Sequence, residues 1–248
     1  MSLAFAGSLR DDASIMTRNP ICVALDTPDL DRARSLARLL KPHAGYMKIG
    51  MELFYAHGAK GYEAVAVEGL PIFLDLKLHD IPNTVASAIS ALMNLSPRPA
   101  IVNVHAMGGL DMMKAARVAV AGRAKLIAVT ILTSLSDSDL HAAGFDSAKD
   151  TNDHARSLAE LARKAGLDGV VCSAHDVAGI RQATGKDFLT VVPGIRPVNA
   201  ATQDQKRIST PEAAIAAGAD ILVIGRAITG AADPAAAAQT ILAGLHAR

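Results

Sequence analysis

The 248-residue sequence contains no tryptophan, and aromatic residues make up only 3% of it. Its interior therefore has to be packed by alanine, valine, leucine and isoleucine, a composition typical of helix-rich α/β proteins. Only two cysteines are present, Cys22 and Cys172, and both fall in apolar runs that resemble strands. This scarcity disfavours a disulfide framework. We interpret both as reduced core thiols, which suits a cytoplasmic protein.

The sequence also lacks a charge imbalance and a long apolar run. Its 25 basic residues nearly balance its 24 acidic residues, so the composition gives no sign of a basic surface that binds nucleic acid. No apolar run reaches the roughly 18–20 residues that a membrane-spanning helix needs. The apolar segment near the N-terminus is short and follows no basic residues, which disfavours a secretory signal. We therefore expect no nucleic-acid partner and no membrane association.

After Pro20, short apolar runs alternate with segments of helical spacing or alanine-rich composition. The predicted strands are Ile21–Asp26, Tyr46–Gly50, Pro71–Leu78, Ala100–Ala106, Leu126–Leu132, Gly169–Ser173, Thr190–Ile195 and Ile221–Gly225. Clear helical segments are Leu30–Leu40, Val85–Leu95, Met112–Ala121, Ala155–Ala165 and Ala235–His246. Regular alternation of this kind predicts an α/β protein with a parallel sheet, and eight strands predict a (β/α)8 TIM barrel.

A doubly wound open sheet is the alternative fold. Six strands would suffice for it, and the glycine-rich turn that binds dinucleotides is absent after the first predicted strand. No Gly/Ser/Pro-rich linker divides the chain. We therefore predict a single barrel domain over residues 19–248. Residues 1–18 have no strong pattern and are interpreted as an N-terminal arm, either flexible or forming a short helix.

The predicted strand Pro71–Leu78 carries two opposite charges within an apolar run. Side chains alternate along a strand, so Asp75 and Lys77 are expected to point the same way. Asp80 follows just beyond the strand, and Pro82 suits the first turn of a new helix. The charges could be a structural ion pair. Because buried pairs often contribute little net stability, a pair inside a strand also indicates function.

Other polar residues lie at the predicted carboxyl ends of the strands, where the active sites of such barrels lie. They are Asp26, Lys48, Asn103, His105, Thr130, Thr133, Arg196 and Arg226. This concentration weakens the purely structural interpretation. Alternation of sign among Asp26, Lys48, Asp75 and Lys77 keeps all four ionised and holds a lysine protonated. Such an array suits loss of a carboxylate followed by protonation of a carbanion.

A phosphate site is predicted after the last two strands. Glycine turns and arginines bind anions, so Gly225, Arg226 and Arg196 are its candidates, although each arginine could be an ordinary surface cation. Residues 197–209 are polar and form a candidate lid whose Gln205 reaches the ligand. Residues 134–150 are also polar and irregular, and they either close over the ligand or merely connect.

The sequence gives no sign of a metal site. His105 is a candidate general base or an oriented neighbour of the reacting groups, and His79 is interpreted as structural. Neither histidine has companions at the spacing of metal ligands, since no His-x-His or Cys pair occurs at that spacing. We predict no metal.

Several of these motifs together resemble the orotidine 5′-phosphate decarboxylase family. They are Ala24-Leu25-Asp26, Lys48-Ile49-Gly50, Asp75-Leu76-Lys77-Leu78-His79-Asp80-Ile81-Pro82-Asn83-Thr84, Pro193-Gly194-Ile195-Arg196 and Gly225-Arg226. The match runs in order from about Ile21 to the last predicted helix. The arm before Asn19 lies outside it.

The resemblance implies an enzyme that decarboxylates orotidine 5′-monophosphate to uridine 5′-monophosphate without metal or cofactor. It implies that Lys77 donates a proton to C6 of the pyrimidine. It further implies that Asp75 faces the substrate carboxylate and that Lys48 and Asp80 complete the charged network.

The resemblance also implies contacts with the nucleotide and a partner chain. The implied substrate contacts are Asp26 and Lys48 to ribose, Thr133 to the pyrimidine, and Arg196, Gln205, Gly225 and Arg226 to phosphate. In the family, the residues corresponding to Asp80 and Thr84 reach into the neighbouring subunit's site, which implies a homodimer.

Two other functions stay open. Magnesium-dependent sugar-phosphate decarboxylases and aldolases of the same superfamily have a similar Asp-x-Lys-x-x-Asp run. They carry glutamate where Lys48 stands, and an ammonium group cannot ligate a metal ion. The second alternative is a non-catalytic barrel that binds a phosphate ligand. The intact acid–base network argues against it.

Overall fold

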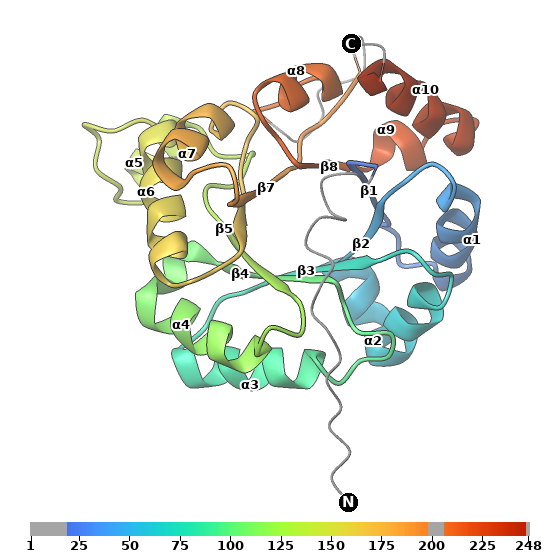
Figure 1. Ribbon diagram of the computed structural model, residues 1–248, viewed down its shortest axis with the longest axis horizontal. Coiled ribbons are helices and arrows are strands. Elements are labelled where there is room, and N and C mark those ends of the chain that lie inside the picture. The colour runs from blue at the N-terminus through green and yellow to red at the C-terminus, as the bar shows by residue number, and fades with distance from the viewer. Residues whose placement is uncertain (1–18, 198–205, 247–248) are drawn as a thin grey trace, which may run out of the picture.

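Strands and helices alternate around a closed barrel (Figure 1). The structure, a computed structural model, describes residues 19–197 and 206–246. Across these residues, eight parallel strands are hydrogen-bonded in sequence order, and the last pairs with the first. They are β1 (Ile21–Ala24), β2 (Tyr46–Gly50), β3 (Ile72–Leu78), β4 (Ile101–His105), β5 (Lys125–Val129), β6 (Gly169–Val171), β7 (Leu189–Val192) and β8 (Ile221–Ile224). The predicted (β/α)8 barrel is confirmed, and closure excludes the open sheet.

Helices surround this barrel on the outside (Figure 1). They are α1 (Leu30–Leu40), α2 (Met51–Ala66), α3 (Pro82–Leu92), α4 (Gly109–Val120), α5 (Asp137–Ala142), α6 (Thr151–Lys164), α7 (Val177–Thr184), α8 (Pro211–Ala216), α9 (Arg226–Thr229) and α10 (Pro234–His246), with the 3-10 turn η2 (Ala106–Gly108). The bounds of β2 and α1 are as predicted, and other predicted bounds shift by a few residues. Residues 134–150, which looked irregular, contain α5.

The start of α3 illustrates why some bounds shift. The helical spacing predicted Val85–Leu95, whereas the helix begins at Pro82 and ends at Leu92. Proline is tolerated at the first helical position because the N–H it lacks would have no intrahelical acceptor there. Apolar periodicity starts only where side chains become buried, at Val85. The apolar pattern therefore could not predict the first turn of this helix.

Alternate side chains of each strand form two separate cores. Residues that point into the barrel, such as Cys22 and Phe73, belong to one buried cluster. Their neighbours Val23 and Leu74 belong to a larger cluster that packs outward against the helices. This period of two places Asp75, two residues after Phe73, on the inner side of the barrel wall.

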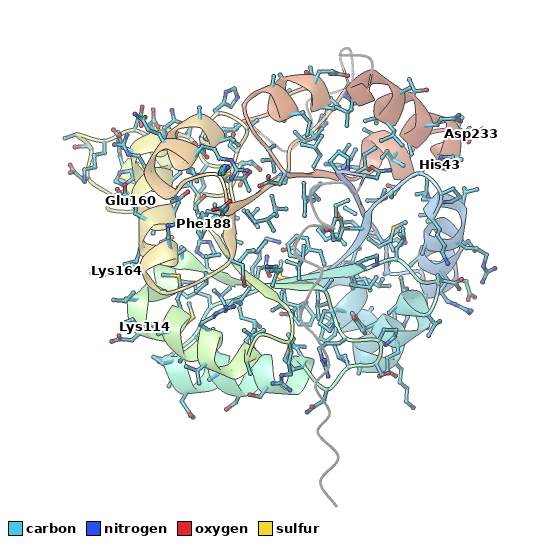
Figure 2. All side chains as sticks on the ribbon, in the orientation of Figure 1. His43, Lys114, Glu160, Lys164, Phe188 and Asp233 are labelled. Atoms are coloured by element: carbon cyan, nitrogen blue, oxygen red, sulfur yellow. The ribbon has the colours of Figure 1, made fainter. Side chains whose placement is uncertain are left out.

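The helices follow the complementary pattern of one buried face. In α6, Ala155 and Ala159 are fully buried, and Ala159 belongs to the core that packs the helices against the strands. Glu160 and Lys164 of the same helix are exposed and lie on the outer rim of the molecule (Figure 2). Apolar spacing of three to four residues therefore fixes which side of each helix meets the strands.

Asn19, the first described residue, is held against the loop between α1 and β2. The Asn19 side chain donates to the His43 carbonyl at 2.8 Å and accepts from the Ile21 N–H at 2.9 Å. The predicted arm, residues 1–18, lies outside the described residues. Among the helices in the described part of the chain, none is both long and apolar enough to span a bilayer.

Candidate active site

A cavity of about 710 Å³ opens where the strands end. The predicted site residues that line it are Asp26, Lys48, Asp75, Lys77, Thr133, Arg196, Gly225 and Arg226. Apolar side chains such as Phe73, Val129 and Val171 complete its wall. Charged groups in such partly dry surroundings interact more strongly than they would in water.

The four predicted charges form one connected network. The Lys48 ammonium lies 2.9 Å from Asp26 Oδ1 and 3.3 Å from Asp75 Oδ2. Lys77 Nζ lies 2.7 Å from the other oxygen of Asp75. Asp75 therefore stands between two cations, while Lys48 stands between two anions. The predicted alternation of sign is present in the contacts.

Burial and charge act in opposite directions on this network. Lys48 and Asp75 are each only 7% exposed. Burial disfavours the charged form of Asp75, but Lys48, Lys77 and the Asn103 hydrogen bond outweigh it and lower the pKa of that carboxyl. Burial likewise opposes the charge on Lys48, yet Asp75 and Asp26 raise the pKa of its ammonium. Both groups are therefore ionised at neutral pH.

The backbone of Lys77 departs from strand geometry. Its φ is 51°, in the left-handed region that residues other than glycine rarely adopt. The pairing of β3 with β4 shifts register between Leu74 and Leu78. Lys77 and Asp75 face the same cavity, as predicted, but not by simple alternation, because the extended backbone is interrupted at Lys77. Such irregularities re-aim a side chain at a site.

Asn103, one of the polar residues expected at the strand ends but given no role there, joins the candidate site through two hydrogen bonds. Its amide donates to Asp75 Oδ1 at 2.7 Å, and its oxygen accepts from the Lys77 N–H at 2.8 Å. The side chain is 1% exposed. One residue thus orients both the carboxylate and the displaced backbone. Its inward position on β4, two residues after the inward Ile101, was the available signal.

Gly50 makes room for the ion pair between Lys48 and Asp26. A Cβ atom at this position would lie 3.0 Å from Lys48 Nζ and 3.1 Å from Asp26 Oδ1. The glycine of the Lys48-Ile49-Gly50 motif is therefore needed for space at the network, since its φ of −91° suits any residue.

Asp80 and Thr84 are not among the described residues that line the cavity. Asp80 is exposed, and its carboxylate accepts from the Ile81 N–H at 2.6 Å. It borders a separate, more open hollow formed by the start of α3 and by η2. Within the described part of one chain, Asp80 and Lys77 therefore border different hollows. Their cooperation stays a prediction about two chains.

His79 and His105 stack on each other beside the end of β4. Their ring centroids are 5.3 Å apart with an angle of 21° between the planes. Within the described part of the chain, Nδ1 of His105 is buried without a hydrogen-bond partner. Burial, with smaller electrostatic contributions from the neighbouring His79 and Lys77, lowers the pKa of His105. The ring is therefore neutral at pH 7 and does not itself line the cavity.

The phosphate-site candidates lie after β7 and β8. Gly225 and Arg226 line the cavity where β8 passes into α9, and Arg196 lines it after β7. The Arg196 N–H donates to the Ser209 carbonyl at 2.9 Å, which joins the two ends of the segment 197–209. Gln205 and most of that segment lie outside the described residues.

In the part of the chain that the structure describes, no group of three or more His, Cys, Asp or Glu side chains is arranged to hold a metal ion. Cys22 and Cys172 are buried and free, and burial raises the pKa of both thiols.

Comparisons with known proteins cover most of the chain. A family model described as "Orotidine 5′-phosphate decarboxylase / HUMPS family" matches residues 19–241. The orotidine 5′-phosphate decarboxylase of Rhodospirillum rubrum is 52% identical over 235 residues, which cover 91% of this chain and 94% of the relative. That of Novosphingobium aromaticivorans is 52% identical over 227 residues, which cover 92% and 99%.

Solved structures show the same similarity as the sequence comparisons. The crystal structure of orotidine 5′-phosphate decarboxylase from Lactobacillus acidophilus superposes with a TM-score of 0.79 at 38% identity, covering 92% of this chain and all of the other. The matched region of the family model contains the whole cavity. This chain is therefore an enzyme of the carboxy-lyase class and belongs to the orotidine 5′-phosphate decarboxylase family.

Proposed function

We propose that this enzyme converts orotidine 5′-monophosphate to uridine 5′-monophosphate and CO2 in de novo pyrimidine biosynthesis, without metal or cofactor. Family membership supports decarboxylation in this pathway. The finer proposal is that Lys77 protonates C6 of the pyrimidine. The observation that carries it is the Lys77 ammonium, held 2.7 Å from Asp75 inside the cavity.

The reaction needs stabilisation of a localised carbanion. When the bond between C6 and the carboxylate breaks, CO2 leaves and the electron pair stays on C6. A fixed ammonium lowers the energy of that charge more than the energy of the bound substrate, which accelerates the step. The proton then passes from Lys77 Nζ to C6, and the resulting amine regains a proton from water.

Asp75 has two roles in this proposal. Its carboxylate holds the Lys77 ammonium in place, and Asn103 in turn orients Asp75. It also faces the leaving carboxylate of the substrate, where repulsion between two anions would favour departure of CO2. Because Lys48 contacts the same carboxylate, Asp75 remains ionised while it does so.

The rest of the nucleotide is assigned to the rim of the same cavity. We place the ribose at Asp26 and Lys48, and the pyrimidine at Thr133. The phosphate is assigned to Arg196, Gln205, Gly225 and Arg226, whose donors suit a dianion. All of these except Gln205, which lies outside the described residues, line one cavity.

A homodimer with shared sites is part of the proposal, as is a cytoplasmic location. Asp80 and Thr84 would enter the partner chain's site. Asp80 sits in a separate hollow, and apolar Ile81 and Met107 beside it are 66% and 47% exposed. Exposed apolar side chains next to unused polar groups suit an interface between two copies. The buried free thiols Cys22 and Cys172 suit a reducing compartment.

A magnesium-dependent reaction on a sugar phosphate is the less favoured function. The Lys48 ammonium already lies within 3.3 Å of both Asp26 and Asp75, where it neutralises the carboxylates that a cation would need. A non-catalytic phosphate-binding barrel is also disfavoured. Such a protein would have no use for Lys77, whose backbone is strained and whose side chain lines the cavity.

The direct test is an absorbance assay of orotidine 5′-monophosphate loss with purified enzyme in excess EDTA. We expect turnover at the same rate with and without the chelator. Lys77→Ala should lower kcat by about a thousandfold or more, because both the proton and the stabilising charge are lost. Lys114→Ala, at an exposed position on α4 (Figure 2), is the control and should keep full activity. Dependence on a divalent ion, or an active Lys77→Ala enzyme, would refute the mechanism.

A further inference from the structure

Arg207 makes a buried ion pair outside the catalytic network. Its guanidinium donates to Asp176, and their side chains are 10% and 0% exposed. The same guanidinium donates to Asn152 on α6 at 3.0 Å. The second oxygen of Asp176 accepts from the Ser173 N–H at 3.0 Å, directly after β6. Arg207 is therefore fastened to the turn between β6 and α7.

The backbone at Arg207 is fastened to a different loop. The N–H groups of Lys206 and Arg207 both donate to the Thr133 carbonyl, each at 3.1 Å. Thr133 lies between β5 and α5 and lines the cavity. Lys206 Nζ also lies 2.7 Å from Asp139 of α5. One short segment thus ties the loop after β5 to the turn after β6.

This arrangement is costly if its purpose is stability alone. Burial raises the pKa of Asp176, although the Arg207 guanidinium and the Ser173 N–H oppose that rise. Nη1 of Arg207 is buried without a hydrogen-bond partner among the described residues. Buried pairs of this kind can often be replaced by apolar residues without loss of stability. The need to hold this segment in a fixed position explains the Arg207–Asp176 pair better than a need for stability does.

We infer that Arg207 is a positioning residue for Thr133, which it holds at the cavity wall through Asp176 and through its own backbone N–H. The inference rests on the proposed function, in which Thr133 contacts the pyrimidine. Arg207 touches no reacting atom in the proposed mechanism. Its removal lets Thr133 shift, and small displacements at a site can cost large factors in rate.

A double-mutant cycle separates this role from a purely structural one. Arg207→Met should lower kcat/KM for orotidine 5′-monophosphate about tenfold, mainly through KM. In a Thr133→Val background, which has already lost the hydroxyl, the same change should cost less than about threefold, because coupled residues are not additive. Arg207→Lys keeps a cation for Asp176 and should recover part of the loss. Arg156→Ala, which removes an exposed pair on α6, should change nothing.

Arg207→Met leaves a buried carboxylate unpaired, so an Asp176→Asn/Arg207→Met variant keeps the test usable if the single variant does not fold. It removes both charges and should show the same dependence on Thr133. Equal losses in the wild-type and Thr133→Val backgrounds would overturn the inference while leaving the proposed function intact. A wild-type enzyme that does not consume orotidine 5′-monophosphate would overturn both.

Discussion

Lys77 is held in a backbone conformation that an ordinary strand residue does not adopt. A left-handed conformation costs a non-glycine residue about 1–2 kcal/mol. Two nearby interactions offset this cost. The Asn103 side chain accepts a hydrogen bond from the Lys77 N–H, and the Asp75 carboxylate pairs with the Lys77 ammonium. Strain that persists because its surroundings over-determine it is a feature of functional sites.

Asn103 is the residue whose loss should expose this dependence. Asn103→Ala removes a fully buried hydrogen-bonding side chain and leaves the Lys77 N–H without its acceptor. We expect a loss of about 1–3 kcal/mol in the free energy of unfolding, measured by urea denaturation. The kcat should fall about tenfold or more, since Asp75 also loses a donor. Asn94→Ala, at an exposed position after α3, should have neither effect.

His105 should give the enzyme a distinct pH dependence of stability. Burial lowers its folded-state pKa from the usual value of 6.5, and the neighbouring His79 and Lys77 add to the effect. As the pH falls below about 6.5, the unfolded chain binds a proton that the folded chain refuses, so stability is lost. His105→Gln cannot titrate and should lose less stability over the same interval.

NMR titration of the His105 ring is the direct measurement of that pKa. A midpoint at or above the usual histidine value would contradict the interpretation. Urea denaturation at several pH values, with wild type and His105→Gln side by side, measures the stability difference itself.

In the proposed function, the elements around the cavity divide into those that carry the reacting groups and those that bind the phosphate. β3 and β4 carry the lysine, the carboxylate and the amide that orients them. The segments after β7 and β8 carry the arginines that we assign to phosphate. Because these elements come from different parts of one closed barrel, binding energy from the phosphate can orient a reacting atom that the arginines do not touch.

Arg226 tests that division. Arg226→Ala should lower kcat/KM about a hundredfold even though the arginine is far from the chemistry in this assignment. Arg226→Lys keeps the positive charge but lacks the planar guanidinium, and it should recover part of the lost kcat/KM. Arg38→Ala removes an exposed arginine paired with Glu68 and serves as the control. Unchanged steady-state kinetics in Arg226→Ala would count against the phosphate assignment.

The whole molecule is proposed to be completed by a second copy. Within one chain Asp80 lies apart from the cavity that holds Lys77, although both residues belong to the same continuous motif. A site shared between two chains would give both ends of that motif a catalytic role. A closed two-fold dimer is the commonest assembly that would present the same face twice.

Mixing two inactive variants tests the shared site. Lys77→Ala and Asp80→Asn proteins are combined under conditions that allow subunit exchange. If Asp80 serves the neighbouring chain, each hybrid dimer contains one site free of both substitutions, and an equal mixture should regain about a quarter of wild-type activity. Exchange proven by mass spectrometry with no recovery would rule out the crossing.

The barrel and the gathering of charge at its rim were both predictable from local patterns. Alternating apolar runs encode strand faces, and helical spacing encodes the buried side of each helix, so the order of elements follows from neighbouring residues alone. Parallel strands bring their carboxyl ends to one edge. Asp26, Lys48 and Asp75 could therefore be expected together before any contact was known.

Contacts across the barrel could not be read in the same way. The conformation of Lys77 depends on an amide on the next strand, and the environment of Thr133 depends on Arg207, far along the chain. Local spacing specifies which way a side chain faces, but a register shift or a buried ion pair forms only once distant segments have packed. Those long-range contacts fix the geometry of the candidate site.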